Sequence, residues 1–172
     1  MADTLVNRVA SSGIMTIDLE VYYPTVQIVE IDLKDYLYME LILKEKDFRT
    51  ALKGVDWNSY KGQQVLVNCS VDAIIPMWAY MLVATYLQGV AVGVYQGDMG
   101  SYLAHYYEAA LGGLDLQDYQ DKMVVIKGCG DKPVPAAAYL KLTTLLQPVA
   151  KSIMYGEPCS TVPIYKRPRP QS

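Results

Sequence analysis

The chain has 172 residues, of which 52% are hydrophobic and 19% are charged, and its formal net charge is −3. This composition excludes an intrinsically disordered chain, because such sequences are poor in apolar residues and rich in charge. It also disfavours a nucleic-acid-binding protein, which needs a basic surface to displace counterions from phosphates. The length predicts a single domain over residues 1–172.

Residues 1–47 predict an N-terminal extension that packs on the sheet. The stretch "DTLVNRVASSG" is typical of a short capped helix, and "VQIVEIDL" alternates as an edge strand does. The start of the chain has neither the charged region nor the apolar region of a secretory signal. We therefore predict a cytoplasmic protein, in which three cysteines are thiols or metal ligands rather than disulfides.

The middle of the chain repeats itself. Residues 48–101 align without a gap with residues 107–160, and 17 of the 54 pairs are identical. This agreement predicts an internal duplication, repeat 1 over 48–101 and repeat 2 over 107–160. The most apolar run, "AIIPMWAYMLVATYLQGVAVGVY", is divided by Gln88 and Gly89, so it predicts a helix and then a strand rather than a membrane span.

Each repeat predicts the order helix, strand, helix, strand, with strands near 64–68, 91–96, 123–127 and 150–155. Runs such as "VLV" and "VVI" are typical of strands buried on both faces of a parallel sheet. The predicted fold class is α/β, a mostly parallel sheet with helices on both faces, built from two tandem α-β-α-β repeats plus the N-terminal helix and edge strand. Residues 161–172 contain prolines and predict a C-terminal tail along the surface.

The three cysteines, Cys69, Cys129 and Cys159, each follow a predicted strand. Because the carboxyl ends of parallel strands meet at one edge of a sheet, the sequence predicts a shared soft-metal site that holds zinc or an iron–sulfur cluster. The alternative is three independent buried thiols, since cysteine is among the most buried residue types. Candidates for a fourth ligand are Asp98, Asp131, Glu157 and His105, although His105 is more typical of a surface or packing histidine.

A second mechanism uses the loop "KGCGDK" around Cys129. A helix N-terminus and two cations would stabilise a thiolate there, as a nucleophile or a sulfur carrier, or the loop would hold an anion. The residues predicted for this anion site are Gly128, Gly130, Lys127 and Lys132. Tyr80 and Tyr139, which match across the repeats, are interpreted as packing residues.

The residues therefore leave three functions open. The first is a metal- or cluster-binding accessory protein. The second is a cysteine-dependent sulfur-transfer or anion-handling enzyme centred on Cys129, and the third is a non-catalytic interaction module.

Four segments carry a resemblance to a known family: "ILKEKDFR", "SVDAIIPMWAYMLVA", "VVIKGCGDKPVP" and "KSIMYGEPCSTVPIYKR". They resemble a bacterial family of unassigned role, catalogued as domain of unknown function 2480, over nearly the whole chain. Members of that family often lie beside genes for iron–sulfur cluster assembly of the sulfur-mobilisation type. The resemblance therefore implies iron–sulfur assembly proteins as partners, and it implies no activity. A homodimer stays open, and neither nucleic acid nor a membrane is expected as a partner.

Overall fold

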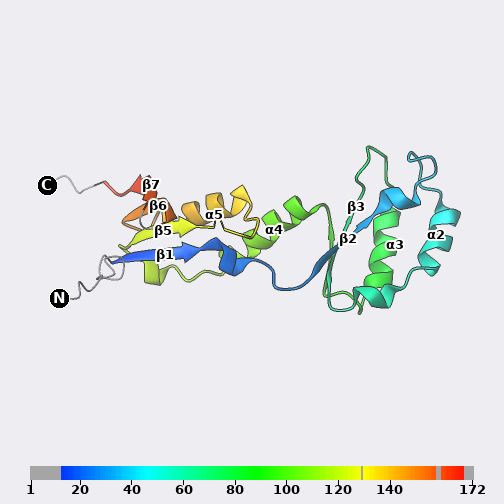
Figure 1. The fold of residues 1–172 in the computed structure, drawn as a ribbon, viewed down its shortest axis with the longest axis horizontal. Helices are drawn as coiled ribbons and strands as arrows, with labels where there is room; N and C mark the ends of the chain where they lie inside the picture. Colours follow the sequence, from blue (N-terminus) through cyan, green and yellow to red (C-terminus); the bar gives the residue numbers. More distant parts are fainter. Residues whose placement is uncertain (1–12, 129, 158–159, 169–172) are drawn as a thin grey trace, which may run out of the picture. The chain divides into compact units, whose positions relative to one another are not determined.

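The computed structural model describes residues 13–168 apart from 129 and 158–159. These residues divide into two compact units. Unit 1 comprises the residues up to Tyr23 and those from Leu103 onward, and unit 2 comprises Pro24–Tyr102. Each unit has its own sheet (Figure 1), where the sequence predicted one sheet. The predicted N-terminal helix lies almost entirely in residues 1–12, outside the described residues.

Unit 2 is built on a parallel sheet of three strands in the order β2-β3-β4. Its elements are β2 (Ile28–Asp32), the 3₁₀ helix η2 (Leu33–Tyr36), α2 (Glu45–Lys53), η3 (Trp57–Tyr60), β3 (Gln64–Asn68), α3 (Met77–Leu87) and β4 (Gly93–Gln96). The edge strand predicted from "VQIVEIDL" is confirmed as β2. The strand predicted at 64–68 is confirmed as β3.

Unit 1 has a sheet of four strands in the order β1-β5-β6-β7, of which the first three are parallel. Its elements are β1 (Ile14–Asp18), η1 (Leu19–Tyr22), α4 (Met99–Gly112), η4 (Gln117–Tyr119), β5 (Met123–Lys127), α5 (Ala136–Leu146), β6 (Ser152–Glu157) and β7 (Ser160–Lys166). The boundary between the units falls within α4. The predicted α/β class with mostly parallel strands is confirmed.

The predicted C-terminal tail is part of the sheet as far as Lys166. β7 pairs antiparallel with β6, and the register shifts between Ile153 and Met154. Pro163 lies opposite Met154, directly beside this shift. An edge strand with an irregular register tolerates a proline, because the missing N–H is not needed for an interior ladder. The prolines therefore correctly excluded an interior strand. The prediction of an unpaired tail is wrong as far as Lys166.

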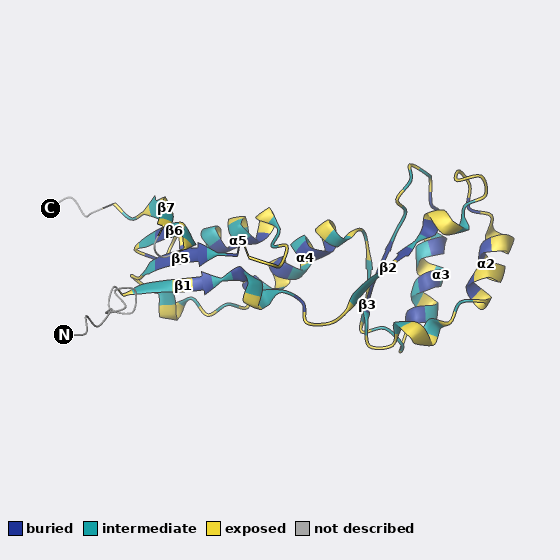
Figure 2. Cartoon of the chain, in the orientation of Figure 1, coloured by how far each residue is buried: buried dark blue, intermediate teal, exposed yellow. Residues whose placement is uncertain are grey.

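Within each unit, both helices pack against the same face of the sheet. In unit 2, Phe48 and Leu52 of α2 and Val83 of α3 form one buried cluster with Val65 and Val67 of β3. Figure 2 shows buried residues on the side of α3 that faces the strands. Strands that are added in chain order through right-handed crossovers place successive helices on the same side. The prediction that helices flank mostly parallel strands is confirmed, and within each unit both helices contribute to one buried cluster with the strands.

The first strand of each unit ends in the tripeptide Ile-Asp-Leu. The side chains of Asp18 and Asp32 each accept a hydrogen bond at 3.0 Å from the backbone N–H two residues further on, of Glu20 and Lys34. The following leucines, Leu19 and Leu33, are fully buried. This local bond turns the chain from the strand into a 3₁₀ helix.

Each unit therefore contains the order strand, 3₁₀ helix, α-helix, 3₁₀ helix, strand, α-helix, strand. The residue-by-residue equivalence of 48–101 with 107–160 stays a prediction, and superposition of these segments tests it. Among the described residues, no helix is long and apolar enough to cross a membrane.

Candidate functional site

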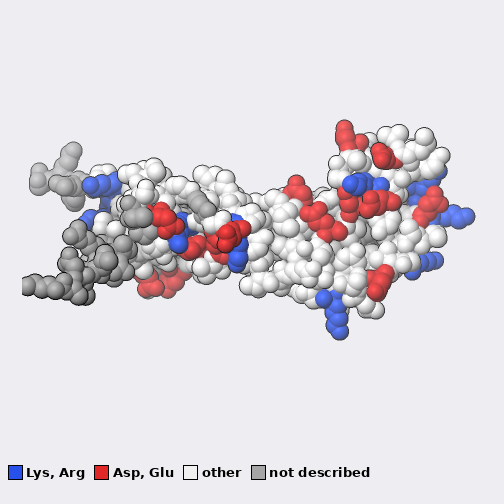
Figure 3. Space-filling model, viewed as in Figure 1, with Lys and Arg blue, Asp and Glu red and all other residues white. Residues whose placement is uncertain are grey.

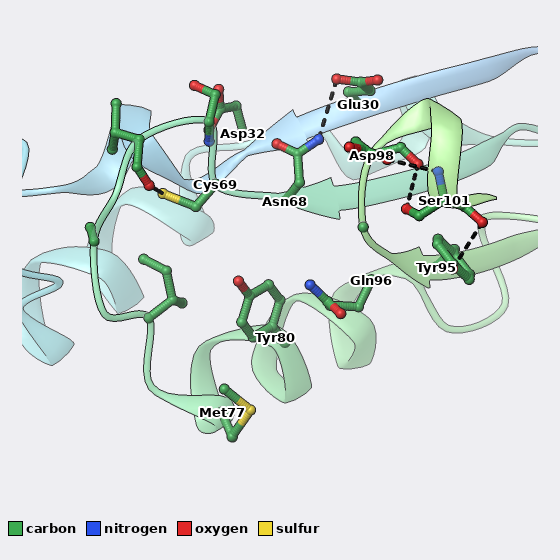
Figure 4. A pocket seen from close by; sticks show the side chains of 15 residues that line it. Glu30, Asp32, Asn68, Cys69, Met77, Tyr80, Tyr95, Gln96, Asp98 and Ser101 are labelled. Atoms are coloured by element: carbon green, nitrogen blue, oxygen red, sulfur yellow. Dashed lines mark hydrogen bonds between the residues drawn. The ribbon is translucent and has the colours of Figure 1, made fainter. Parts of the chain in front are cut away.

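A pocket of about 950 Å³ lies at the carboxyl edge of the unit 2 sheet (Figure 4). Its walls come from the ends of all three strands and from the segments that follow them. The lining residues are Glu30, Asp32, Asn68, Cys69, Ser70, Val71, Ala73, Ile75, Met77, Tyr80, Tyr95, Gln96, Gly97, Asp98 and Ser101. The carboxyl edge is where open parallel sheets form ligand sites, because the loops there converge.

Asp32 joins the end of β2 to the loop after β3. Its Oδ1 accepts hydrogen bonds from the backbone N–H of Lys34 and of Ser70, each at 3.0 Å. Burial raises the pKa of Asp32, but the hydrogen bonds from Ser70 and Lys34 outweigh that effect and hold the pKa below its usual value. Asp32 therefore carries its negative charge at neutral pH.

Two further carboxylates are also held in place. The Asn68 side-chain amide donates to Glu30 Oε2 at 3.3 Å. Asp98 precedes α4 and accepts a hydrogen bond from the Ser101 backbone N–H at 2.8 Å, as a helix N-cap does. The hydrogen bonds from Ser101 hold the pKa of Asp98 below its usual value. Each carboxylate keeps its orientation through contacts within the chain.

The lining of the pocket also contains a thiol, a phenol and an amide. The half-buried Cys69 thiol donates to the Val71 carbonyl at 3.5 Å. Burial, and then the neighbouring Cys69, raise the pKa of Tyr80, while a hydrogen bond with Gln96 lowers it in part. Figure 4 shows the Tyr80 hydroxyl and the Gln96 side chain pointing into the pocket. Tyr80 and Gln96 therefore add uncharged hydrogen-bonding groups to the lining of the pocket.

The pocket has a one-sided charge. Among the described residues, its lining contains three carboxylates and no lysine, arginine or histidine. Lys34 lies 3.4 Å from Asp32 Oδ2 but does not line the pocket. Figure 3 shows acidic side chains gathered over the part of unit 2 that contains β2 and β3. A positively charged group would therefore be attracted into the pocket.

Unit 1 has a lysine at the corresponding place. Lys127 ends β5 and lies 3.2 Å from Asp18 Oδ2 and 3.8 Å from Glu157 Oε1. The hydrogen bond with Asp18, and then the charges of Asp18 and Glu157, raise the pKa of Lys127. In the strand registers Asp18 pairs with Lys127, and in unit 2 Asp32 pairs with Asn68. The repeat alignment also matches Asn68 with Lys127 and Asp98 with Glu157.

The loop predicted to hold an anion contains partners from the chain itself. The Gly130 backbone N–H donates to the Glu20 carboxylate. Lys127 is paired with Asp18 and Glu157, and Lys132 lies over the ring of Tyr23, 5.5 Å from its centroid. Gly128 is packed so closely that an added Cβ would lie 2.7 Å from the Tyr139 hydroxyl. An external anion at Gly128, Gly130, Lys127 and Lys132 stays a prediction, and it would compete with these carboxylates.

The structure brings together two of the residues predicted as metal ligands, Cys69 and Asp98, which line the same pocket. Cys129 and Cys159 lie outside the described residues, in the part of the sequence assigned to unit 1. Unit 1 also contains Asp131, which is exposed, Glu157, which pairs with Lys127, and His105, which is exposed on α4. Over the described ranges, no three His, Cys, Asp or Glu side chains form a group that could hold a metal ion.

A family model described as "Protein of unknown function (DUF2480)" matches residues 3–167. The chain belongs to the DUF2480 family. No curated protein and no solved structure matches it.

Sequence reasoning missed most of the pocket of this DUF2480 protein. It identified Cys69 and Asp98, and it interpreted Tyr80 as a packing residue. Glu30, Asp32, Asn68, Tyr95, Gln96 and Ser101 were not singled out. One signal was available, because the tripeptide Ile-Asp-Leu occurs at 17–19 and at 31–33. That repetition marks the ends of two equivalent strands and would have indicated Asp32 as an edge residue.

Proposed function

We propose that the protein is a binding protein for a small organic cation, and that the carboxyl-edge pocket of unit 2 is its site. The observation that carries this proposal is the lining of the pocket, which contains Glu30, Asp32 and Asp98 and no cationic side chain from the described part of the chain. Three carboxylates that line one pocket favour a positive partner, because their mutual repulsion is relieved when one binds.

The comparison with unit 1 supports an ammonium group as the cation. In unit 1 the Lys127 Nζ lies between two carboxylates, those of Asp18 and Glu157. In unit 2 the corresponding carboxylates are Asp32 and Asp98, and the residue at the lysine position is Asn68. An ammonium group of a ligand would supply the charge that the lysine supplies in unit 1.

The remaining polar groups suit a ligand with several hydrogen-bond donors. Tyr80, Gln96 and Ser101 provide oxygen acceptors around the carboxylates. A volume of about 950 Å³ is at the upper end for sites that hold small molecules. An extended polyamine therefore fits the pocket in both charge and size.

We expect the substitution Asn68→Lys to weaken binding of spermidine at least about tenfold, because it places a built-in ammonium among the same carboxylates. All three carboxylates are retained in this variant. Weaker binding would therefore mean that the lysine occupies the position of the ligand's ammonium group. The measurement is isothermal titration calorimetry of the full chain at about 0.15 M salt, where exposed charges are largely screened.

The matched control is Glu40→Gln, which changes the net charge by the same amount at an exposed residue of unit 2 that does not line the pocket. Binding by this control should equal that of the unsubstituted protein. Equal binding by Asn68→Lys, or no spermidine binding by the unsubstituted protein, would show that the pocket does not take an organic cation.

A second candidate function is a soft-metal or iron–sulfur-binding accessory protein, with iron–sulfur assembly proteins as partners. It is favoured by the strand arrangement. β5 and β6 are parallel neighbours, and Cys129 and Cys159 each come two residues after the last residue of one of these strands. Two thiols that follow adjacent strand ends suit zinc or a cluster. The described residues alone do not complete such a ligand set.

Anaerobic purification followed by metal analysis tests this second candidate. We expect bound zinc or iron in a fixed ratio to protein, and loss of most of it in the variant Cys129→Ser/Cys159→Ser. The variant Asp98→Asn, in unit 2, is the control. It should keep the metal if Cys129 and Cys159 are the main ligands. A metal-free protein after anaerobic purification would exclude this function.

A further inference from the structure

A second pocket, of about 470 Å³, lies on unit 1 and is distinct from the site proposed above. Its lining residues are Met123, Lys151, Ser152, Met154, Pro163, Tyr165, Lys166 and Arg167. They come from the start of β5, from β6 and the residue before it, and from β7 and the residue after it. The pocket therefore spans three adjacent strands at the end of the sheet opposite its carboxyl edge.

The strand register shows which face of the sheet forms the floor of this pocket. Met123 pairs with Ser152, and Ser152 pairs with Lys166, so these three residues point to one side. Met154 lies two positions after Ser152 and points to the same side, opposite Pro163. Ile153 points to the other side and belongs to the core under the helices. The floor is therefore the face of the unit 1 sheet that α4 and α5 do not cover.

The floor and the rim have different chemistry. Met123, Met154 and Pro163 make the floor apolar, and Lys151, Lys166 and Arg167 make the rim basic. No acidic residue is among the described residues that line the pocket. Arg167 is fixed in place, because its guanidinium pairs with Asp121 and donates to the Val149 carbonyl at 2.6 Å. Within the described part of the chain, neither Lys151 nor Lys166 makes an ion pair.

We propose that this pocket binds an organic anion with an unbranched apolar chain, such as a medium-chain carboxylate. The apolar chain would cover the methionine floor, which removes apolar surface from water. The carboxylate would lie at the rim, where Lys151 and Lys166 each offer a charged hydrogen-bond donor that makes no ion pair with another described residue. The lysines select against a cationic or neutral amphiphile, and the apolar floor selects against a small inorganic anion.

Decanoate, kept below the concentration at which it forms micelles, is the probe for this pocket. We expect it to bind the full chain and to shift the methyl NMR signals of Met123 and Met154, which lie in the floor. The variant Lys151→Gln/Lys166→Gln should weaken binding by at least about tenfold, which corresponds to one lost hydrogen bond to a charged group. Both lysines are exposed, so the variant should fold.

The matched control is Lys53→Gln/Lys61→Gln, which removes two exposed charges of unit 2 and should leave decanoate binding unchanged. Decylamine should not shift the signals of Met123 and Met154. The proposal is overturned if the two double variants lose binding equally, if decylamine binds as well as decanoate, or if the two methionine signals do not move. Because the ligands of the two pockets have opposite charge, these results are independent of the spermidine experiment.

Discussion

Replacement of Phe48 by alanine is expected to lower the free energy of unfolding by about 3–5 kcal/mol. Phe48 is 1% exposed and lies at the centre of the unit 2 core. Its ring makes edge-to-face contacts with Tyr36, at a centroid distance of 5.2 Å, and with Trp78, at 6.0 Å. Truncation would remove both contacts and leave a cavity between α2 and the sheet, which the surrounding side chains can fill only in part.

Urea denaturation followed by tryptophan fluorescence measures this loss directly. The chain has two tryptophans, Trp57 and Trp78, and both belong to unit 2. The control is Phe48→Leu, which keeps most of the apolar volume and should cost less than about 1.5 kcal/mol. A loss below about 1 kcal/mol for Phe48→Ala would contradict the packing of α2 described here.

Tyr107→Phe is expected to destabilise unit 1 by about 1–3 kcal/mol, because it leaves a buried carbonyl without its donor. Tyr107 is fully buried, and its hydroxyl donates to the Leu19 carbonyl at 2.9 Å. The repeat alignment matches Tyr107 with Phe48. Tyr107 and Phe48 therefore have corresponding places in the two cores, and they differ only in the hydroxyl group.

The same substitution should change how stability depends on pH. Burial, and then the nearby Tyr23 and Glu20, raise the pKa of Tyr107 from 10.0 to about 12. A group whose pKa is raised by folding stabilises the folded state fully at a pH below its pKa in the unfolded chain. This stabilisation is lost as the pH rises through the pKa of the folded state. The contribution of Tyr107 to the free energy of unfolding should therefore be lost in the unsubstituted protein as the pH rises from about 10 to about 12.

The Tyr107→Phe variant should not lose this contribution. The difference in the free energy of unfolding between the two proteins should therefore become smaller as the pH rises. Urea midpoints from circular dichroism over this pH range measure the difference. Tyr38→Phe, on an exposed residue of unit 2, is the control and should change neither the midpoint nor its pH dependence. A pH dependence identical in Tyr107→Phe and the unsubstituted protein would argue against a buried, proton-bearing phenol.

The elements of the fold that sequence predicts best are those with buried apolar runs. The strands expected at 64–68 and 123–127 are β3 and β5, which are the central parallel strands of their units. β1 was missed because the repeat with a shift of 59 begins only at residue 48. The first strands lie 14 positions apart instead, as Ile17 and Ile31 show. No single shift aligns all the strands of the two units.

The candidate site was harder to predict, because its chemistry depends on which strands are neighbours. Cysteines attract attention in a sequence since they are few, whereas Asp32 and Asn68 are ordinary polar residues. Their significance comes from the register that pairs Asp32 with Asn68 in unit 2 and Asp18 with Lys127 in unit 1. That pairing could not be derived while the first strands were interpreted as an extension of a single domain.

The position of β1 in the chain has a consequence for the order in which the protein folds during synthesis. Ile28 of β2 pairs with Gln64, so the unit 2 sheet joins segments that leave the ribosome close together in time. Ile14 of β1 pairs with Met123, which is made only after the whole of unit 2. Closing so long a segment is entropically costly and slows folding. A newly made chain should therefore complete unit 2 first, while β1 waits with an open edge for β5. During this interval chaperones would be most useful to the chain.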